Sequence, residues 1–350
     1  MLEKKVTRRT LLSTGVAAGA MVLATPYIAN AQAVTLNVTG WGGKWGDEFD
    51  KNLTAMFEAE TGGKLQRDTS FPFLPKLQAS SRSDPIYDVL HTNNNEQWAA
   101  AEMGLIEPVV PADQVPNMAD LYDYAKSDKV AGVVMFTSAI GLGYRKDLVS
   151  APPASWTDLW LEQYADRRGA YVISVNSLGQ AFLTMTASIY GSGPDDLEAA
   201  YAALEKLKPV KLVDFTGSME KMLLGGEVSL GIIHDSGVFR NLEANPDLEF
   251  ASPKEGVLAL EQVLSVTAGT KKKELAYAYI DFMLRPDVQK TMAEAVWYSP
   301  ANSKVVLEDQ FQNRLLTTPE KVATLVQVDW KWYNANKDAI DARVARIFRA

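Results

Sequence analysis

Short apolar runs alternate with amphipathic segments along most of the chain. Residues 35–39 have the alternating composition of a strand. Phe49, Leu53, Met56 and Phe57 then recur at the spacing of one buried helix face, and the glycines at 62 and 63 end that helix. The beginning of the chain's folded part therefore predicts a strand followed by an amphipathic helix.

The same alternation continues to the C-terminus. It predicts strands at residues 87–90, 133–144, 171–175, 210–215 and 228–233. It predicts helices at residues 96–103, 156–164, 178–190, 194–207, 216–224, 234–242, 272–284, 287–295 and 338–348. Strands that alternate with helices are typical of mainly parallel sheets covered on both faces, so the fold class is α/β.

Small or polar residues fill the turns that follow the predicted strands. These turns are residues 42–44, 93–95, 176–177, 216–218 and 234–236. Helix capping explains any one of them, because Ser, Thr, Asn and Asp are the usual caps. Ligands of open α/β sheets bind beyond the carboxyl ends of strands, so the turns together also predict a cleft lined by polar groups.

The first 33 residues depart from this pattern. Arg8 and Arg9 precede an apolar run of about 13 residues, and small residues at positions 29, 31 and 33 offer cleavage after Ala31 or Ala33. A membrane span needs about 20 residues, so the run is too short to be an anchor. We therefore expect a twin-arginine export signal over residues 1–33 and a mature protein in the periplasm.

Charge and composition exclude several classes of protein. The chain has a formal net charge of -8, and removal of residues 1–31 leaves −11, which disfavours nucleic acid and anionic membranes as partners. Cysteine is absent and histidine occurs twice, so thiolate catalysis and His-rich metal sites are excluded. The mature length exceeds what one core usually supports, which predicts two lobes. We expect a protein without cofactor and without catalytic activity.

Several segments resemble one family of binding proteins. Residues 272–290 are similar to the late helix pair of bacterial extracellular solute-binding proteins, and residues 298–302 to the loop that follows it. Residues 155–160 and 253–256 agree with the same family, in its spermidine/putrescine-binding branch. The resemblance covers about residues 34–302.

This resemblance implies a two-lobed periplasmic-binding-protein fold, type II-like, with a hinge and a ligand cleft between the lobes. Lobe 1 would comprise residues 34–137 and 267–305, and lobe 2 residues 138–266 and 306–350. The protein would be a monomer that captures a small polar solute and delivers it to the permease subunits of an ABC transporter.

The site of the polyamine binders carries over only in part. Trp41 and Tyr298 stand where the resemblance implies aromatic contacts to the ligand. The positions of the carboxylates that hold ammonium groups are occupied here by Ser177, Gln180 and Gln262, and two further aromatic positions by His234 and Leu260. Burying a polyamine without paired carboxylates is costly, so we expect a different ligand.

The remaining candidates form a mixed set of aromatic, charged and neutral polar residues. The expected ligand-binding residues are Trp41, Lys44, Trp45, Asn93, Asn94, Thr137, Ser177, Gln180, Ser218, His234, Asp235, Gln262 and Tyr298. Asp235 and Glu261 would meet a cation, and Lys44 an anion. The solute would be amino-acid-like, opine-like or polyamine-related, and this combination suits a zwitterion or a polyhydroxylated amine best.

Two alternatives remain open from the sequence. An exported hydrolase could use Asp235 with Glu261 as a pair of carboxylates for general acid–base catalysis. A ferric-ion receptor is a third option, but it would need tyrosinate and carboxylate ligands, and Tyr190 and Tyr298 are not adjacent in a way that favours one. The chain lacks the G-x-S-x-G, H-E-x-x-H and P-loop motifs.

Overall fold

The computed structural model describes residues 33–349, so the predicted export signal lies outside the described residues except for Ala33. The strands are β1 (Thr35–Thr39), β2 (Lys64–Asp68), β3 (Val89–Asn93), β4 (Val133–Arg145), β5 (Arg168–Tyr171), β6 (Lys211–Val213), β7 (Leu230–His234), β8 (Leu248–Ala251), β9 (Val257–Val266), β10 (Ser299–Pro300) and β11 (Leu325–Val326). The helices are α1 (Gly43–Phe49), α2 (Ala55–Thr61), α3 (Leu74–Ala79), α4 (Asn94–Glu102), α5 (Ser177–Tyr190), α6 (Leu197–Lys206), α7 (Thr216–Gly225), α8 (Asp235–Phe239), α9 (Lys273–Leu284), α10 (Pro286–Val296), α11 (Asp309–Gln312), α12 (Pro319–Val322) and α13 (Trp330–Arg349).

One continuous sheet runs through these elements, in the order β2-β1-β3-β9-β4-β7-β5-β6. The outer strands pair in parallel, as the alternation of strands and helices predicts. The centre differs from that prediction, because β4 and β9 pair antiparallel with each other and with their outer neighbours. The chain passes along β4 in one direction and returns along β9 in the other, which requires the antiparallel pair.

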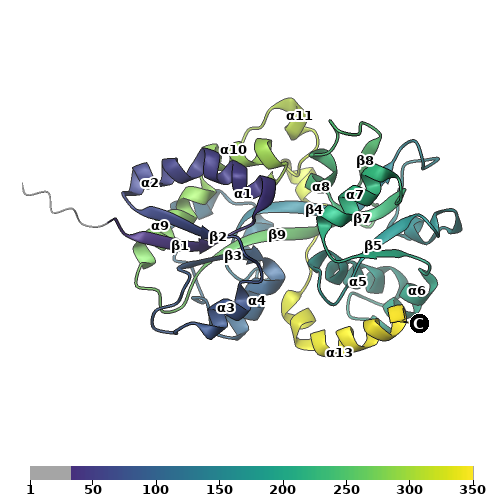
Figure 1. The fold of residues 1–350 in the computed structure, drawn as a ribbon, viewed down its shortest axis with the longest axis horizontal. Helices are drawn as coiled ribbons and strands as arrows, with labels where there is room; N and C mark the ends of the chain where they lie inside the picture. The colour runs from purple at the N-terminus through teal and green to yellow at the C-terminus, as the bar shows by residue number, and fades with distance from the viewer. Residues whose placement is uncertain (1–32, 350) are drawn as a thin grey trace, which may run out of the picture. The chain divides into compact units, whose positions relative to one another are not determined.

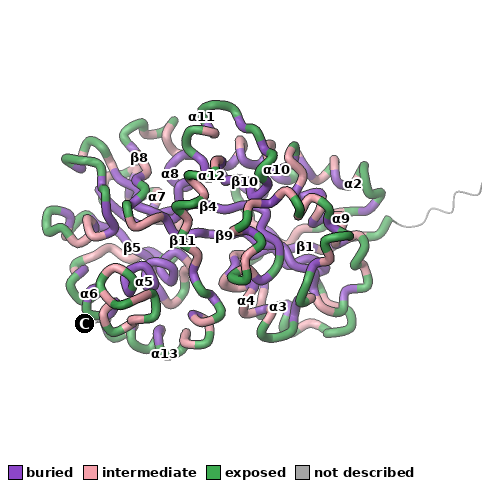
Figure 2. Tube along the Cα trace, turned by 180° about the vertical axis from the view of Figure 1, so that it is seen from behind, coloured by how far each residue is buried: buried purple, intermediate pink, exposed green. Residues whose placement is uncertain are grey.

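The two central strands are long and buried along almost their whole length. All ten residues of β9 are buried, and so are twelve of the thirteen in β4. Strands covered on both faces have nearly continuous apolar runs, and β4 was predictable from such a run. In Figure 1 these two strands connect the elements on the left with those on the right, and Figure 2 shows them as buried from behind.

Two large hydrophobic clusters lie along the sheet. The first contains Phe49, Val89 and Ile280, and the second contains Trp156, Phe182 and Tyr333. We call the elements around the first cluster lobe 1 (β1–β3, α1–α4, α9 and α10) and those around the second lobe 2 (β5–β8 and α5–α8). The residue bounds given for the lobes above stay a prediction.

Several predicted elements begin elsewhere than the pattern indicated. The strand predicted at 171–175 ends at Tyr171 and begins at Arg168, whose buried guanidinium donates hydrogen bonds to the carbonyl oxygens of Leu159 and Pro209 at 3.0 Å. The helix predicted from residue 194 begins at Leu197, because the Asp196 carboxylate caps it. Buried charge and capping, rather than apolar periodicity, set these two boundaries.

Two helix predictions were wrong in extent. The helix predicted at 156–164 is a pair of short 3-10 segments interrupted at Leu161, and Ser155 and Asp158 form a capping box at its start. The C-terminal helix begins at Trp330 rather than at 338. Among the described helices, none combines the length and the hydropathy that crossing a bilayer requires.

Candidate ligand-binding site

The middle of the β4–β9 pair presents different residues on its two faces. Gln262 lies opposite Phe136, and Glu261 lies opposite Thr137. Because successive side chains of a strand point to opposite faces, Gln262 and Glu261 belong to different sides of the sheet. The candidate residues of the centre therefore divide into two groups.

On the Gln262 face, strand β3 contributes Asn93 and His91. Asn93 is the direct neighbour of Gln262 across the ladder, and His91 lies two residues earlier on the same face. The His91 Nε2 atom lies 3.2 Å from Gln262 Oε1. Burial lowers the pKa of His91 to about 3, so its ring is neutral at physiological pH.

The two tryptophans near the end of β1 differ in their surroundings. Trp41 is half-buried, and its ring meets the edge of His91 with 5.7 Å between centroids. Trp45 is buried and stacks on Phe49 at 5.3 Å, so it forms part of the core of lobe 1. Trp41 therefore keeps an accessible surface for a ligand. Lys44 lies between them in sequence and is exposed.

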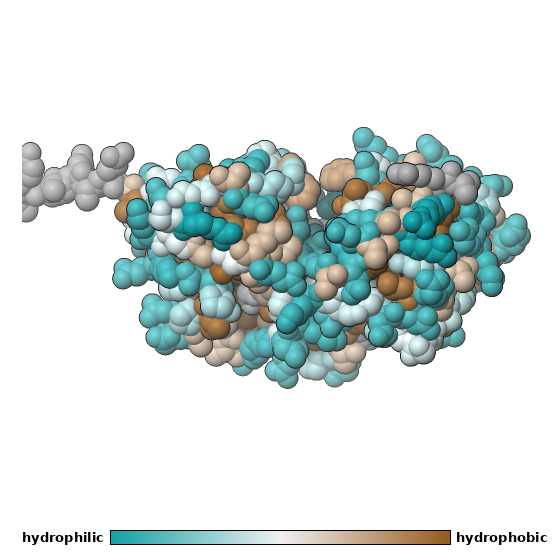
Figure 3. All heavy atoms as spheres, turned by 90° about the horizontal axis from the view of Figure 1, so that it is seen from below, coloured by the Kyte–Doolittle hydropathy of each residue, from teal (hydrophilic) through white to brown (hydrophobic). Residues whose placement is uncertain are grey.

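Side-chain amides and a hydroxyl connect the two lobes. The Asn93 amide donates to Ser177 Oγ at 3.4 Å, and the Asn95 amide donates to Gln180 Oε1 at 3.2 Å. Ser177 and Gln180 both lie in the first turn of α5, which the Asn176 side chain caps at the backbone N–H of Leu178. In Figure 3 a hollow separates the two halves of the visible surface. The first turn of α5 thus faces the end of β3.

The wall from lobe 2 contains the second histidine. His234 Nδ1 accepts hydrogen bonds from Gly237 N at 3.2 Å and from Ser236 Oγ at 2.9 Å, and thereby caps α8. Its ring stacks on Tyr298, with 6.2 Å between centroids. Burial lowers the pKa of His234 to about 3, and the neighbouring Arg240 charge adds to this shift.

Asp235 follows His234 and is 1% exposed. Burial raises the pKa of its carboxyl to about 7, although the N–H groups of Ser236 and Ala139 and the Ser138 hydroxyl partly oppose this shift. A cationic group placed beside it would favour the ionised form. Asp235 is therefore the titratable member of this wall.

Glu261 lies on the other face and has a different environment. Its Oε1 accepts from Gln327 Nε2 at 3.0 Å, and burial raises its pKa to about 7. Thr137, its neighbour across the ladder, accepts from the Tyr124 hydroxyl at 2.9 Å. Glu261 and Thr137 therefore do not join the Gln262 group.

The structure does not bring all the predicted residues together. Asn94 is buried, donates to the carbonyl of Lys129 at 2.8 Å and accepts from Ala131 N, so its side chain holds a loop. Ser218 is half-buried in the first turn of α7. The residues that do surround the Gln262 face are Trp41, Asn93, Gln262 and Tyr298 and, from lobe 2, Ser177, Gln180, His234 and Asp235.

Three residues of this region were missed by the sequence reasoning. His91 was predictable, because it precedes Asn93 by two positions on one strand face. Asn95 lies in the turn at residues 93–95, which the sequence predicted. Only Asn93 and Asn94 of that turn were proposed as ligand-binding residues. Arg240, which forms an ion pair with Glu220 and lies near His234 and Tyr298, had no sequence signal of its own.

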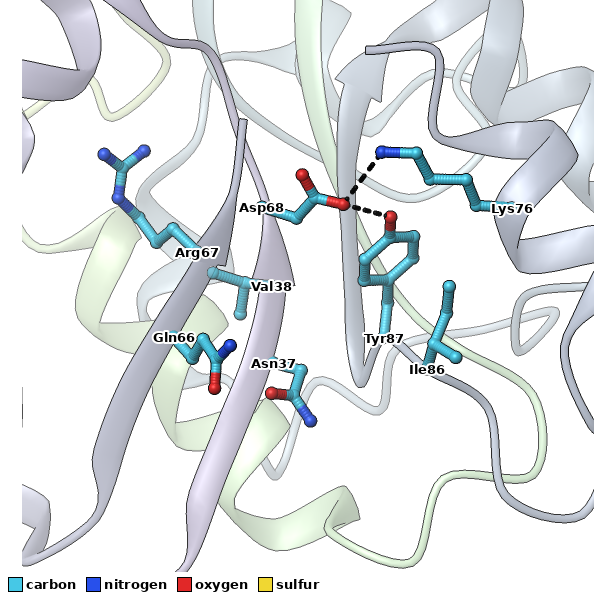
Figure 4. A pocket seen from close by; sticks show the side chains of 8 residues that line it. All are labelled: Asn37, Val38, Gln66, Arg67, Asp68, Lys76, Ile86 and Tyr87. Carbon is cyan, nitrogen blue, oxygen red and sulfur yellow. Dashed lines mark hydrogen bonds and ion pairs between the residues drawn. The ribbon is translucent and has the colours of Figure 1, made fainter. Parts of the chain in front are cut away.

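A separate cavity of 410 Å³ lies at the edge of lobe 1, lined by Asn37, Val38, Gln66, Arg67, Asp68, Lys76, Ile86 and Tyr87. The Asp68 carboxylate accepts hydrogen bonds from Lys76 and Tyr87, as Figure 4 shows. None of the predicted site residues lines it. Asp68 pairs with Lys76 inside the cavity, and Arg67 pairs with Asp50 outside its lining.

The comparisons with known proteins decide the family. The sequence model of the family described as bacterial extracellular solute-binding protein matches residues 52–339. The chain belongs to this family. The two-lobed α/β fold predicted above is confirmed, since this solute-binding protein superposes with a TM-score of 0.77 on the crystal structure of an ABC transporter protein from Clostridium perfringens. That structure is 24% identical and aligns over 89% of this chain and 99% of the other.

Curated relatives of this solute-binding protein cover most of its length. The spermidine/putrescine-binding periplasmic protein of Salmonella typhimurium is 26% identical over 90% of this chain and 91% of that protein. A candidate 2-aminoethylphosphonate-binding periplasmic protein of Salmonella typhi is 25% identical over 66% of this chain and 67% of that protein. Proteins of this family bind small solutes for ABC importers and work with permease subunits.

Proposed function

We propose that this solute-binding protein captures a small zwitterionic or polyhydroxylated amine, amino-acid-like or opine-like, in the periplasm and delivers it to an ABC permease. The ligand would lie between the lobes, on the Gln262 face of the β4–β9 pair. Trp41 and Tyr298 would contact its apolar or cationic parts, and Asp235 would meet its amine.

The observation that carries the proposal is the chemistry of the groups that face one another across the lobes. They are amides and a hydroxyl: Asn93 with Ser177, and Asn95 with Gln180. Asp235 is the one acid among the predicted residues of this face. A single carboxylate matches one ammonium group, whereas a di- or polyamine has at least two to neutralise. The N-terminal end of α5 adds the partial positive charge of the helix dipole for an acidic group.

The proposal also accounts for the two carboxylates that a hydrolase could have used. Glu261 shares its face with Thr137 and Tyr124, while Asp235 lies beside Ser138, whose side chain has the opposite direction in β4. They therefore do not flank a common space. Among residues 33–349, no group of three or more His, Asp or Glu residues is arranged to hold a metal ion.

A thermal-shift screen of the mature protein tests the proposal. Amino acids, opines, polyamines, sugars and phosphorylated compounds would be added to the same preparation. Binding to the folded state stabilises it by about 2.7 kcal/mol when the ligand is at 100 times its Kd. We expect a zwitterion or polyhydroxylated amine to raise the Tm most. Stabilisation by spermidine or putrescine alone would contradict the proposal, and turnover of the stabilising compound would exclude a receptor.

The Trp41→Ala variant tests the position of the site. Removing a π face that contacts a ligand amine costs about 1 kcal/mol, so affinity should fall about fivefold to tenfold. Trp332→Ala is the control, because Trp332 is also half-buried but packs against the hydrophobic cluster of lobe 2. Equal affinities of the two variants, measured by titration calorimetry, would remove Trp41 from the site.

A further inference from the structure

His91 and Gln262 form a buried pair whose hydrogen bond has two possible directions. The exposed fractions are 0% for His91 and 1% for Gln262, and the joining atoms are Nε2 and Oε1 at 3.2 Å. A neutral imidazole carries one proton. If the proton is on Nε2, His91 donates to the Gln262 oxygen; if it is on Nδ1, the amide must be turned so that its NH2 group donates to Nε2. The position of one proton thus sets the orientation of the amide.

The surroundings of His91 Nδ1 decide which of the two ring nitrogens carries the proton. No described residue makes a hydrogen bond to this atom. A Cβ built on Gly40 would lie 3.5 Å from His91 Nδ1 and 3.1 Å from Arg67 Nη1, so the ring nitrogen and the guanidinium border the same small space. A lone pair directed toward a cation is favourable, whereas an N–H group there would be repelled.

Arg67 is fixed in that position by several contacts. Its Nε and Nη2 atoms both lie 2.8 Å from the Asp50 carboxylate, and its other donors reach the carbonyl oxygens of Trp41 and Gly46 at 3.3 and 3.1 Å. Its side chain is 6% exposed. The guanidinium of an arginine carries a positive charge throughout the physiological pH range. It therefore imposes a permanent positive charge on the Nδ1 side of His91.

We propose that His91 carries its proton on Nε2 and so fixes the Gln262 amide with its NH2 group toward the ligand cleft, which makes this position select a carboxylate or another hydrogen-bond acceptor of the ligand over an ammonium group. Gln262 lies next to Asn93, which reaches Ser177 of lobe 2, and an amide whose oxygen is bound to His91 has its NH2 group on the side away from that ring. This inference rests on the proposed function for the location of the ligand. It adds which end of the ligand is read, and by which residue.

The imidazole tautomer tests the inference without any ligand. The chain has two histidines, so 15N-histidine labelling gives two sets of ring signals, and His234→Asn assigns them. We expect the His91 Nε2 shift to be that of a protonated nitrogen and the Nδ1 shift that of an unprotonated one. A protonated Nδ1 would overturn the inference. The absence of any stabilising ligand would instead overturn the proposed function, so the two failures are distinguishable.

A variant with a carboxylate at position 262 tests whether Gln262 selects the acidic end of the ligand. Gln262→Glu keeps an acceptor for His91 Nε2–H but replaces the donor in the cleft by a carboxylate. The probes are γ-aminobutyrate and 1,4-diaminobutane, which share one amine end and differ at the other. We expect the ratio of their Kd values to shift toward the diamine by about tenfold or more, because hydrogen bonds to charged groups are among the stronger ones.

The matched control is Gln310→Glu, which makes the same charge change at an exposed position. It should leave the ratio of the two Kd values as in the wild type. Circular dichroism and the Tm of each variant show whether it is folded. A folded Gln262→Glu protein with the wild-type ratio would overturn the selection by Gln262.

Discussion

The two histidines of this solute-binding protein lie in different lobes and serve the cleft in different ways. Both are buried, and burial lowers the pKa of each to about 3. His234 uses Nδ1 to cap a helix and stacks on Tyr298. His91 leaves Nδ1 without a hydrogen bond and uses Nε2 for Gln262. The same side chain is therefore an element of local folding in lobe 2 and a support for a polar group in lobe 1.

The charges next to the two rings differ as well. In lobe 1 the neighbour is Arg67, held by Asp50, whose pKa is lowered by the hydrogen bond with this guanidinium. In lobe 2 the neighbours are Arg240, which pairs with Glu220, and Asp235, whose pKa burial raises to about 7. The charge beside His91 is thus held in an ion pair, whereas the carboxyl of Asp235 titrates near neutrality. A ligand amine beside Asp235 would bind more weakly in acid.

Arg67→Ala tests the difference between the two lobes most directly, because it removes the positive charge beside His91. The carbonyl oxygens of Trp41 and Gly46 would lose their partner, and the stacking of the guanidinium on Phe49, 4.7 Å from the ring centroid, would be lost. We expect the free energy of unfolding to fall by about 3 kcal/mol, measured by urea denaturation.

The control for this loss is Arg285→Ala. Arg285 also binds an aspartate through two nitrogens and lies over Phe282, but its side chain is 29% exposed. Its loss should cost less than about 1 kcal/mol, as for surface ion pairs. Equal losses for the two variants would mean that burial of Arg67 adds nothing to lobe 1.

Asp235→Asn tests whether the lobe 2 wall is the titrating one. The folded-state pKa of about 7 is above the ordinary value of 3.8, so the folded state holds the proton more tightly than the unfolded state. The wild type therefore loses stability as the pH rises from about 4 to about 7. Asn cannot titrate, so the stability of the variant relative to the wild type should rise by about 1.4 kcal/mol per pH unit in this window and then level off.

The measurement is the free energy of unfolding of both proteins at several pH values. Glu261 and both histidines titrate in wild type and variant alike, so their contributions cancel in the difference. Asp113→Asn, at an exposed position, is the control and should show no such slope. A difference that is constant between pH 4 and 7 would mean that Asp235 ionises normally.

Apolar patterning predicted the elements that a core requires. The run at 133–144 and the stripe of Phe49, Leu53 and Phe57 are buried as expected, because periodicity reports burial directly. The run at 257–266 was not assigned to a strand, since Glu261 and Gln262 interrupt its apolar character. Both are buried all the same, because they find partners in Gln327 and His91.

A residue of the candidate site was predictable from the sequence only where the end of one strand or the start of one helix determines its position. Ser177, His234 and Asp235 follow predicted strands, and the structure places them at helix starts. Which side of the sheet Gln262 and Glu261 occupy depends on the register between β4 and β9, and a one-residue shift would exchange them. Local pattern contains no information about that register. The pairing of Asn95 with Gln180 depends on the same long-range arrangement.

His234→Ala tests whether His234 stabilises lobe 2 through its helix cap, and its expected effect is the smallest. It removes the acceptor of the Gly237 N–H, whereas His234→Asn supplies another acceptor of the kind that helix caps prefer. Both variants lose the ring that stacks on Tyr298, so their difference isolates the cap. We expect His234→Ala to be less stable than His234→Asn by about 1 kcal/mol, measured as a difference in Tm and in urea midpoint. If the two variants were equally stable, the ring of His234 would contribute by packing alone, and the contrast between the histidines would reduce to the hydrogen bond between His91 and Gln262.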